Sequence, residues 1–130
     1  MILTIAVALA LATIPQFAWI FTQAHAANKA FAVFSATLIA KDYERAYALT
    51  TPDFQSAISE LDFTRQQTAL RSDLGDLKKI IPDSYETQEH QEGWSSDISA
   101  RFVFRKAERR FDFALKKQGA VWKVNGYRER

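Results

Sequence analysis

Three stretches in the last third of the chain alternate apolar and polar residues: "DISARFVFRK", "RRFDFALKK" and "AVWKVNGYRER". Successive side chains of a β-strand point to opposite faces, so this period of two predicts three strands that share one buried face. Their connections are short, and the second passes through Gly119, which predicts an antiparallel meander. The positions predicted to face the core are Ile98, Ala100, Phe102, Phe104, Phe111, Phe113, Leu115, Trp122 and Val124.

The stretch before this meander, "LKKIIPDSYETQEH", also has an extended character. It contains Pro82, which has no backbone N–H to donate to a neighbouring strand. We therefore expect either an edge strand or two short pieces joined by a turn at Asp83 and Ser84.

Residues 27–40 have the spacing of a helix. Phe31, Phe34 and Leu38 recur at intervals of three and four, which places them on one helical face. Asp42 then follows as the predicted N-cap of a second, short helix, because its carboxylate accepts a hydrogen bond from an amide of the next turn.

The rest of the first half carries further helix signals. Tyr43 and Tyr47 lie four apart and share a face of the second helix. Thr51 precedes a proline at a first helical position, and Ser59 gives a second, weaker start signal. Gly75 suits a helix end. We therefore expect three helices between residues 27 and 75.

Residues 1–26 contain no charged side chain other than His25 and are mostly apolar. The "AHA" at 24–26 suits signal-peptide cleavage after Ala26, and Pro15 interrupts the apolar run. A positively charged start is missing, and the apolar stretch to Phe21 is long enough to span a bilayer. A cleaved signal peptide and an uncleaved membrane anchor therefore both stay open, beside a wrongly assigned start.

The first two alternatives give the same domain organisation: a targeting or anchoring segment at 1–26 and a globular domain at 27–130. They also place the domain outside the cytoplasm, either in a bacterial periplasm or held at the inner membrane. The chain has no cysteine, which excludes disulfides, thiol nucleophiles and lipid-modified cysteine.

Three segments resemble one known fold. The stretch "AKDYERAYALTTPDF", the "LGDL" that closes the helical half and the final "GAVWKVNGY" are similar to small secreted members of the nuclear transport factor 2-like superfamily, which includes SnoaL-like and ketosteroid-isomerase-like proteins. The resemblance covers residues 27–130. It implies an α+β cone, with N-terminal helices packed on a curved antiparallel sheet. It does not imply a function, because this superfamily mixes enzymes, ligand binders and assembly components.

In such cones the sheet curls around a pocket with a helical lid, and aromatic side chains collect at its mouth. The resemblance therefore suggests candidate ligand-binding residues, and the alternative is that each is an ordinary core aromatic. These candidates are Tyr43, Tyr47, Tyr85, Trp94 and Trp122.

An enzyme of this superfamily needs an ionisable group in the pocket, but none of the inward strand positions can transfer a proton. Asp112 lies between two inward phenylalanines and is expected on the outer face, paired with Arg101, Arg105 or Arg110. His90 stands in a polar, acidic stretch without the partners of a metal site. We expect no catalytic residue, no metal and no cofactor.

Basic side chains fall opposite the inward positions, so we expect a positive outer face that attracts an anionic membrane surface or an acidic partner, or is simply solvated. The residues are Arg101, Arg105, Arg110, Lys116 and Lys123. Nucleic acid is not expected, because no aromatic alternates with these positions. Like-charge repulsion across such a face favours a monomer.

The functional hypothesis is a non-catalytic, exported domain that binds a small apolar ligand or a protein partner. The first alternative is a membrane-anchored scaffold component of an envelope or secretion assembly. The second alternative is an enzyme of the isomerase or hydrolase kind.

Overall fold

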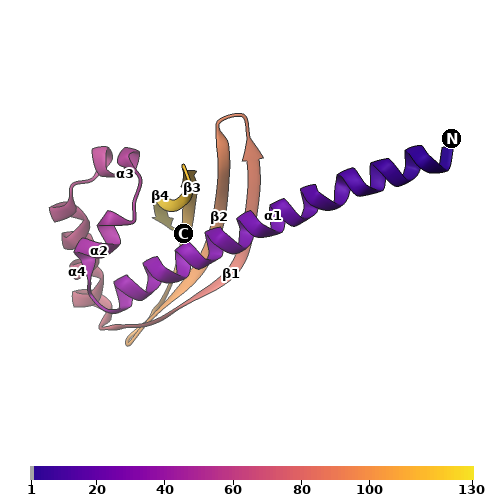
Figure 1. Cartoon of the computed structure of the whole chain (residues 1–130). Helices are drawn as coiled ribbons and strands as arrows, with labels where there is room; N and C mark the ends of the chain where they lie inside the picture. Colours follow the sequence, from indigo (N-terminus) through magenta and orange to yellow (C-terminus); the bar gives the residue numbers. More distant parts are fainter. Residues whose placement is uncertain (1) are drawn as a thin grey trace.

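The computed structural model describes the backbone from Ile2 to Arg130 and the side chains from Ala18 onward. Within these residues four helices precede one antiparallel sheet of four strands, which makes an α+β fold (Figure 1). The helices are α1 (Ile2–Ile39), α2 (Tyr43–Ala48), α3 (Pro52–Ala57) and α4 (Glu60–Leu74). The strands are β1 (Leu77–His90), β2 (Gly93–Phe104), β3 (Glu108–Gln118) and β4 (Val121–Glu129).

The helix starts predicted from sequence are confirmed. The Asp42 carboxylate accepts a hydrogen bond from the Arg45 amide at 3.2 Å and caps α2. The Ser59 hydroxyl accepts one from the Asp62 amide at 3.1 Å and caps α4. The predicted count of three helices is wrong, because α3 and α4 are separate: Ile58 between them is extended, with φ −135° and ψ 123°.

The strands follow one another in the sheet in the order β1, β2, β3, β4. β1 is therefore an edge strand, and of the two alternatives for this segment the single strand is correct. Its pairing with β2 is irregular between Pro82 and Ser84, where the missing proline N–H falls.

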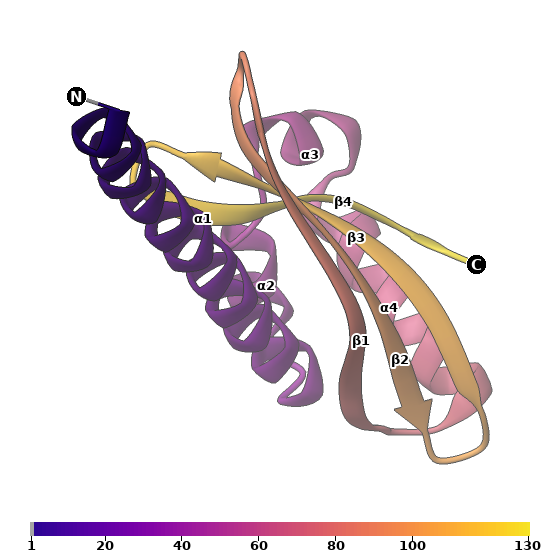
Figure 2. The same cartoon turned by 90° about the vertical axis from the view of Figure 1, so that its right-hand side faces the viewer.

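Every strand position predicted to face inward is buried. Residues Phe31 and Phe34 of α1 pack edge-on against Phe113 of β3, with ring centroids 5.0 and 5.9 Å apart. α1 packs against β1 and β4, α3 packs against β4, and α2 and α4 pack against each other (Figure 2). The inner face of the curved sheet is thus filled by aromatic side chains from both halves of the chain.

β4 contains a bulge that the alternation pattern does not predict. Leu115 pairs with Val124 and Ala114 pairs with Gly126, so Asn125 is an extra residue in β4. A bulge of one residue reverses the side-chain parity beyond it. Tyr127 therefore lies on the inner face, opposite Phe113.

α1 continues without a break through the predicted boundary after Ala26. Gln23 and Ala27, on either side of that boundary, are both buried. The cleavage itself stays a prediction. Among the residues whose side chains are described, no helix has an apolar stretch long enough to cross a membrane.

Candidate functional site

The five aromatic residues predicted to line one pocket lie in different places. Trp122 lines a groove beside α1, and Tyr85 lines a second groove on the outer face of the sheet. Tyr43, Tyr47 and Trp94 line neither groove.

Tyr47 has a structural environment. Its hydroxyl donates to the backbone carbonyl of Ile58 at 2.8 Å, and its ring packs at 5.9 Å from the ring of Phe63. Tyr43 has the guanidinium of Arg71 over its ring, 5.7 Å from the centroid. These contacts help to hold the corner between α2, α3 and α4 together, because both rings are at least half-buried and the Tyr47 hydroxyl has a carbonyl partner.

The groove beside α1, here called the helix groove, has a volume of about 320 Å³ and lies between α1 and the β3–β4 hairpin. Ala26, Ala30 and Val33 recur at four and three along α1, so they form one wall. Their small side chains keep the helix from filling the space. The complete lining is Ala26, Lys29, Ala30, Val33, Leu49, Leu115, Ala120, Val121, Trp122 and Val124.

The indole nitrogen of Trp122 is the notable polar atom of this lining. Trp122 is only 5% exposed, and its Nε1 has no hydrogen-bond partner within the described residues. A buried donor without an acceptor costs about 1–3 kcal/mol. A molecule in the helix groove that carries a carbonyl, ether or carboxylate oxygen would recover part of that cost only if the indole turned its buried N–H toward the groove.

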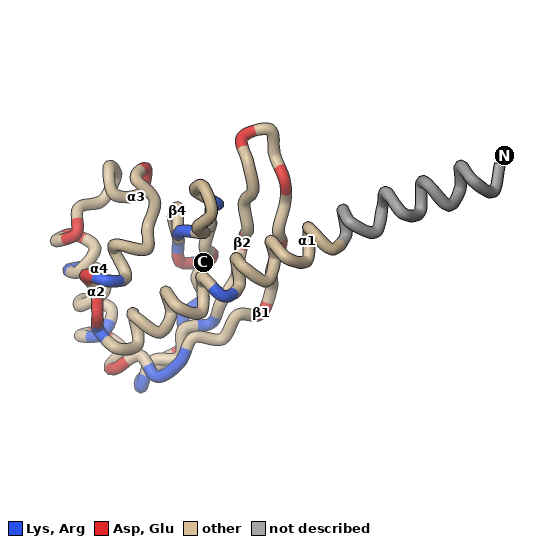
Figure 3. Tube along the Cα trace, in the orientation of Figure 1, with Lys and Arg blue, Asp and Glu red and all other residues tan. Residues whose placement is uncertain are grey.

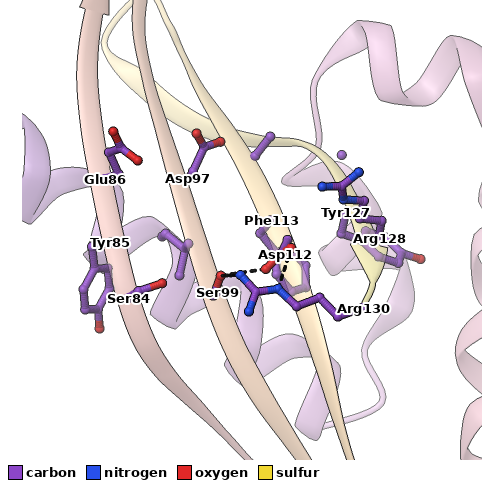
Figure 4. Close-up of a pocket in the computed structure, with 13 residues that line it drawn as sticks. Ser84, Tyr85, Glu86, Asp97, Ser99, Asp112, Phe113, Tyr127, Arg128 and Arg130 are labelled. Atoms are coloured by element: carbon purple, nitrogen blue, oxygen red, sulfur yellow. Dashed lines mark hydrogen bonds and ion pairs between the residues drawn. The ribbon is translucent and has the colours of Figure 1, made fainter.

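A second groove, here called the outer groove, lies on the opposite face of the sheet and has a volume of about 620 Å³. Figure 4 shows its lining, in which the carboxylates of Glu86 and Asp97 stand on β1 and β2 and the guanidiniums of Arg128 and Arg130 come from the end of the chain. Charges of both signs therefore share one shallow surface.

Asp112 lies in the outer groove and is on the outer face, as predicted. Its predicted arginine partners are wrong: it accepts hydrogen bonds from the Ser99 hydroxyl at 2.6 Å and from Nε of Arg130 at 2.9 Å (Figure 4). The Ser99 hydrogen bond, followed by Arg130, lowers the pKa of Asp112 below its ordinary value. Arg130 reaches it because Asp112 pairs with Arg128 in the sheet, which brings the chain end alongside.

The predicted basic face is neutralised at one end. Arg110 forms an ion pair with Asp83 at 2.9 Å, and Arg101 pairs with Glu108 at 3.5 Å. Arg105 lies beyond the end of β2, in the turn before β3. The like-charge argument for a monomer therefore loses its basis, and the oligomeric state stays a prediction.

Lys116 and Lys123 differ from the arginines. They are partners across β3 and β4, and neither forms an ion pair within the part of the chain that the structure describes. Among the described residues, positive charge without an ion pair therefore remains at the β3–β4 hairpin and, at the other end of the sheet, at Lys78, Lys79 and Lys106.

Tyr127 is the residue that the sequence reasoning missed. Its hydroxyl donates to Oε1 of Gln66 and accepts from Nε2 of Gln67, both at 3.1 Å. Burial raises the pKa of its phenol above the ordinary value. The signal available in the sequence was the Asn125–Gly126 pair inside a strand pattern, a combination that marks bulges and turns.

The sequence matches no family model and no curated protein. Among solved structures, the chain is similar to Aln2 from a Streptomyces species, with a TM-score of 0.56 and 11% sequence identity. The match covers 89% of this chain and 91% of Aln2. The two chains share a fold. At this identity the likeness concerns the fold alone, and it agrees with the predicted arrangement of helices on a curved antiparallel sheet.

Proposed function

We propose that the chain is a nuclear transport factor 2-like, SnoaL-like domain that binds a small apolar molecule in the helix groove without transforming it. The overlap with Aln2 along most of both chains supports this assignment, as do the sequence segments that resemble small secreted members of that superfamily. The domain is exported, and residues 1–26 direct that export.

The observation that carries the proposal is the largely apolar lining of the helix groove, which includes Trp122, a residue whose buried indole N–H has no partner among the described residues. Ligand sites are typically apolar cavities with few polar groups that fix orientation. Here the walls provide apolar surface, and a turn of the Trp122 indole toward the bound molecule would provide one donor. The ligand class is therefore an apolar molecule with one hydrogen-bond acceptor.

Binding without catalysis fits the lining of the helix groove. Its only ionisable side chain is that of Lys29, which is exposed. General acid or base catalysis needs an ionisable group held within hydrogen-bond distance of the reacting atom. An exposed lysine on a mobile four-carbon stem does not offer such a fixed position.

The proposal can be tested by NMR of the ¹⁵N-labelled full chain, whose three tryptophans give three indole N–H signals. We use two probes of nearly equal size: 2-nonanone, which accepts a hydrogen bond, and nonane, which does not. We expect 2-nonanone to shift the Trp122 signal and to bind about fivefold more tightly than nonane, because a net hydrogen bond contributes about 1 kcal/mol.

The controls follow from the chain itself. Trp122→Phe identifies the signal and should abolish the preference for the ketone while retaining an apolar wall. The signals of Trp19 and Trp94 should stay in place, since neither residue lines the helix groove. A ketone that leaves the Trp122 signal unmoved, or shifts all three equally, would contradict the proposal.

One observation favours a second candidate, a membrane-tethered component of an envelope assembly. α1 joins the uncharged N-terminal segment to the domain as one continuous helix, and Gln23 is buried against the domain. Cleavage after Ala26 would remove that contact. Intact mass spectrometry of the protein recovered from its own cells distinguishes the two: a chain beginning at Ala27 excludes the tether, and a full-length chain recovered only with detergent supports it.

A further inference from the structure

The end of the molecule where β3 turns into β4 lies beside the N-terminal part of the described α1 (Figure 2). The ammonium of Lys117 sits over the ring of Trp19, 5.2 Å from its centroid. This cation–π contact fixes the hairpin and the helix as neighbours. The two elements therefore present one continuous surface.

That surface exposes large apolar side chains. Trp19 is 51% exposed, Ile20 44% and Phe21 73%, and Val121 on the hairpin is 52% exposed. Residues 19–21 are consecutive, so they point in three directions about 100° apart around the helix axis. At this turn α1 therefore exposes apolar side chains on more than one side, which one flat protein partner would cover only in part.

The same end carries lysines that form no ion pair. Lys29, Lys116, Lys117 and Lys123 form no ion pair among residues 18–130, where the structure describes side chains. The sequence has no acidic residue at 18–41 or at 113–128, and the described part of α1 shows none in Figure 3. The adjacent β1–β2 hairpin is acidic: Asp97 pairs with Ala114, two residues before Lys116, and Glu86 pairs with Asp97. Glu89 and Glu92 follow toward the turn of that hairpin.

We infer that this hairpin end, defined as Trp19, Ile20, Phe21, Lys29, Lys116, Lys117, Val121 and Lys123, docks on the surface of a bilayer that contains anionic phospholipids. Tryptophan favours the boundary between headgroups and acyl chains, and lysines bind the phosphates while their stems lie along apolar surface. Each lysine near an anionic surface strengthens such binding about fivefold. The sequence before Trp19 is uncharged and mostly apolar.

The inference goes beyond ligand binding in the helix groove and does not depend on it. It also differs from anchoring alone. A tether would hold the domain near a bilayer in any orientation, whereas docking places the β3–β4 hairpin against the lipid and leaves the opposite end of the sheet in water.

The absence of cysteine allows a direct test on the full chain. A single cysteine replaces Gln118, which is exposed at the end of β3, and carries an environment-sensitive fluorophore. In the matched control, the cysteine replaces exposed Ser72 in α4. Each protein is reconstituted in vesicles of phosphatidylcholine alone or with phosphatidylglycerol, and acrylamide quenching reports exposure to water.

We expect the label at position 118 to be protected from acrylamide severalfold more in the phosphatidylglycerol vesicles, and the label at position 72 to stay accessible in both. High salt should remove the protection, because the interaction is electrostatic. Replacing Lys116, Lys117 and Lys123 by glutamine should lower the ratio of docked to undocked protein on the order of 100-fold.

The matched variant replaces Lys78, Lys79 and Lys106 by glutamine, which removes the same charge at the other end of the sheet and should leave docking intact. Three results would overturn the inference: an accessible label at position 118 in the anionic vesicles, equal protection in phosphatidylcholine alone, or protection that survives the hairpin substitutions. Equal protection by soluble polyglutamate would overturn the bilayer as the partner.

Discussion

The hydroxyl of Thr51 donates a 2.8 Å hydrogen bond to Oδ1 of Asn125 and at the same time caps α3 by accepting from the Phe54 amide at 3.2 Å. One buried side chain thus joins the start of α3 to the bulge in β4. The bulge in turn directs Tyr127 into the core. The helical half and the sheet are therefore linked at the position where the strand pattern is broken.

Thr51→Val should destabilise the domain by about 2 kcal/mol. The substitution keeps the shape of the side chain but removes the cap and leaves the Asn125 oxygen without its donor, and each loss costs about 1 kcal/mol. The urea midpoint of the circular dichroism signal measures the effect. Thr51→Ser retains the hydroxyl and should cost clearly less; equal losses for the two variants would contradict this role.

Tyr127→Phe should destabilise the domain by about 1 kcal/mol, because buried Gln67 then keeps an unsatisfied amide. Tyr85→Phe is the matched control, since the Tyr85 side chain is half exposed and should tolerate the change. The same denaturation experiment applies. If Tyr127→Phe left the free energy of unfolding unchanged, this would show that water replaces the lost hydroxyl.

The Tyr127 phenol should also give the domain an alkaline limit. Burial raises its pKa in the folded state, so the folded protein binds its proton more tightly than the unfolded chain does. The resulting stabilisation is complete below about pH 10, the ordinary tyrosine pKa, and is lost as the pH rises through the folded value. Unfolding experiments across this range should show a smaller alkaline loss for Tyr127→Phe than for the wild type.

Gly75→Ala should be more damaging than an average turn substitution. Gly75 has φ +83°, and an added Cβ would lie 2.9 Å from the Cβ of Arg105. Backbone strain and this clash together should cost about 2–3 kcal/mol. Gly119→Ala is the control, because Gly119 has φ +63° with nothing within 4 Å of an added Cβ and should cost about 1 kcal/mol. A urea midpoint that is lower for Gly119→Ala than for Gly75→Ala would contradict this prediction.

Asp112→Asn should reduce the sensitivity of the domain to acid. The Ser99 hydroxyl and Arg130 lower the pKa of Asp112 in the folded state, so the unfolded chain binds the proton more tightly. The stabilisation is present above about pH 4 and is lost as the pH falls through the folded value. The variant should be less stable than the wild type at pH 7 and should lose less on acidification.

The control for this pH dependence is Asp73→Asn, at an exposed carboxylate of α4 that forms no ion pair among the described residues. The free energy of unfolding of this variant should change on acidification as it does in the wild type. If the free energies of unfolding of Asp112→Asn and the wild type fall equally on acidification, Arg130, the last residue of the chain, does not hold its position beside Asp112 in solution.

Most of the fold follows from local pattern. The inward phenylalanines of β2 and β3 and the helix starts at Asp42, Thr51 and Ser59 were predicted from spacing and capping chemistry, because these depend on neighbours within a few residues. The separation of α3 from α4 was missed, because only Ile58 and Ser59 lie between the two helices.

The candidate site was predicted less well, because a groove is formed by residues distant in sequence. Trp122 was expected to line a pocket within the cone, and it lines a groove whose other wall is α1. Tyr47 was expected beside it, but its hydroxyl is held by the Ile58 carbonyl in the helical corner. Which aromatic borders empty space depends on how the helices pack, and spacing along the chain does not contain that information.

The sequence by itself determined the alternation that buries one face of three strands, the capped helices and the uncharged N-terminal segment, since each rests on the chemistry of residues close in the chain. Only the tertiary structure decided that Asn125 bulges and turns Tyr127 inward, that Arg130 rather than another arginine meets Asp112, and that Lys117 lies over Trp19. These relationships join residues far apart in the sequence, and their geometry is set by the packing of α1 and the helical half on a twisted sheet.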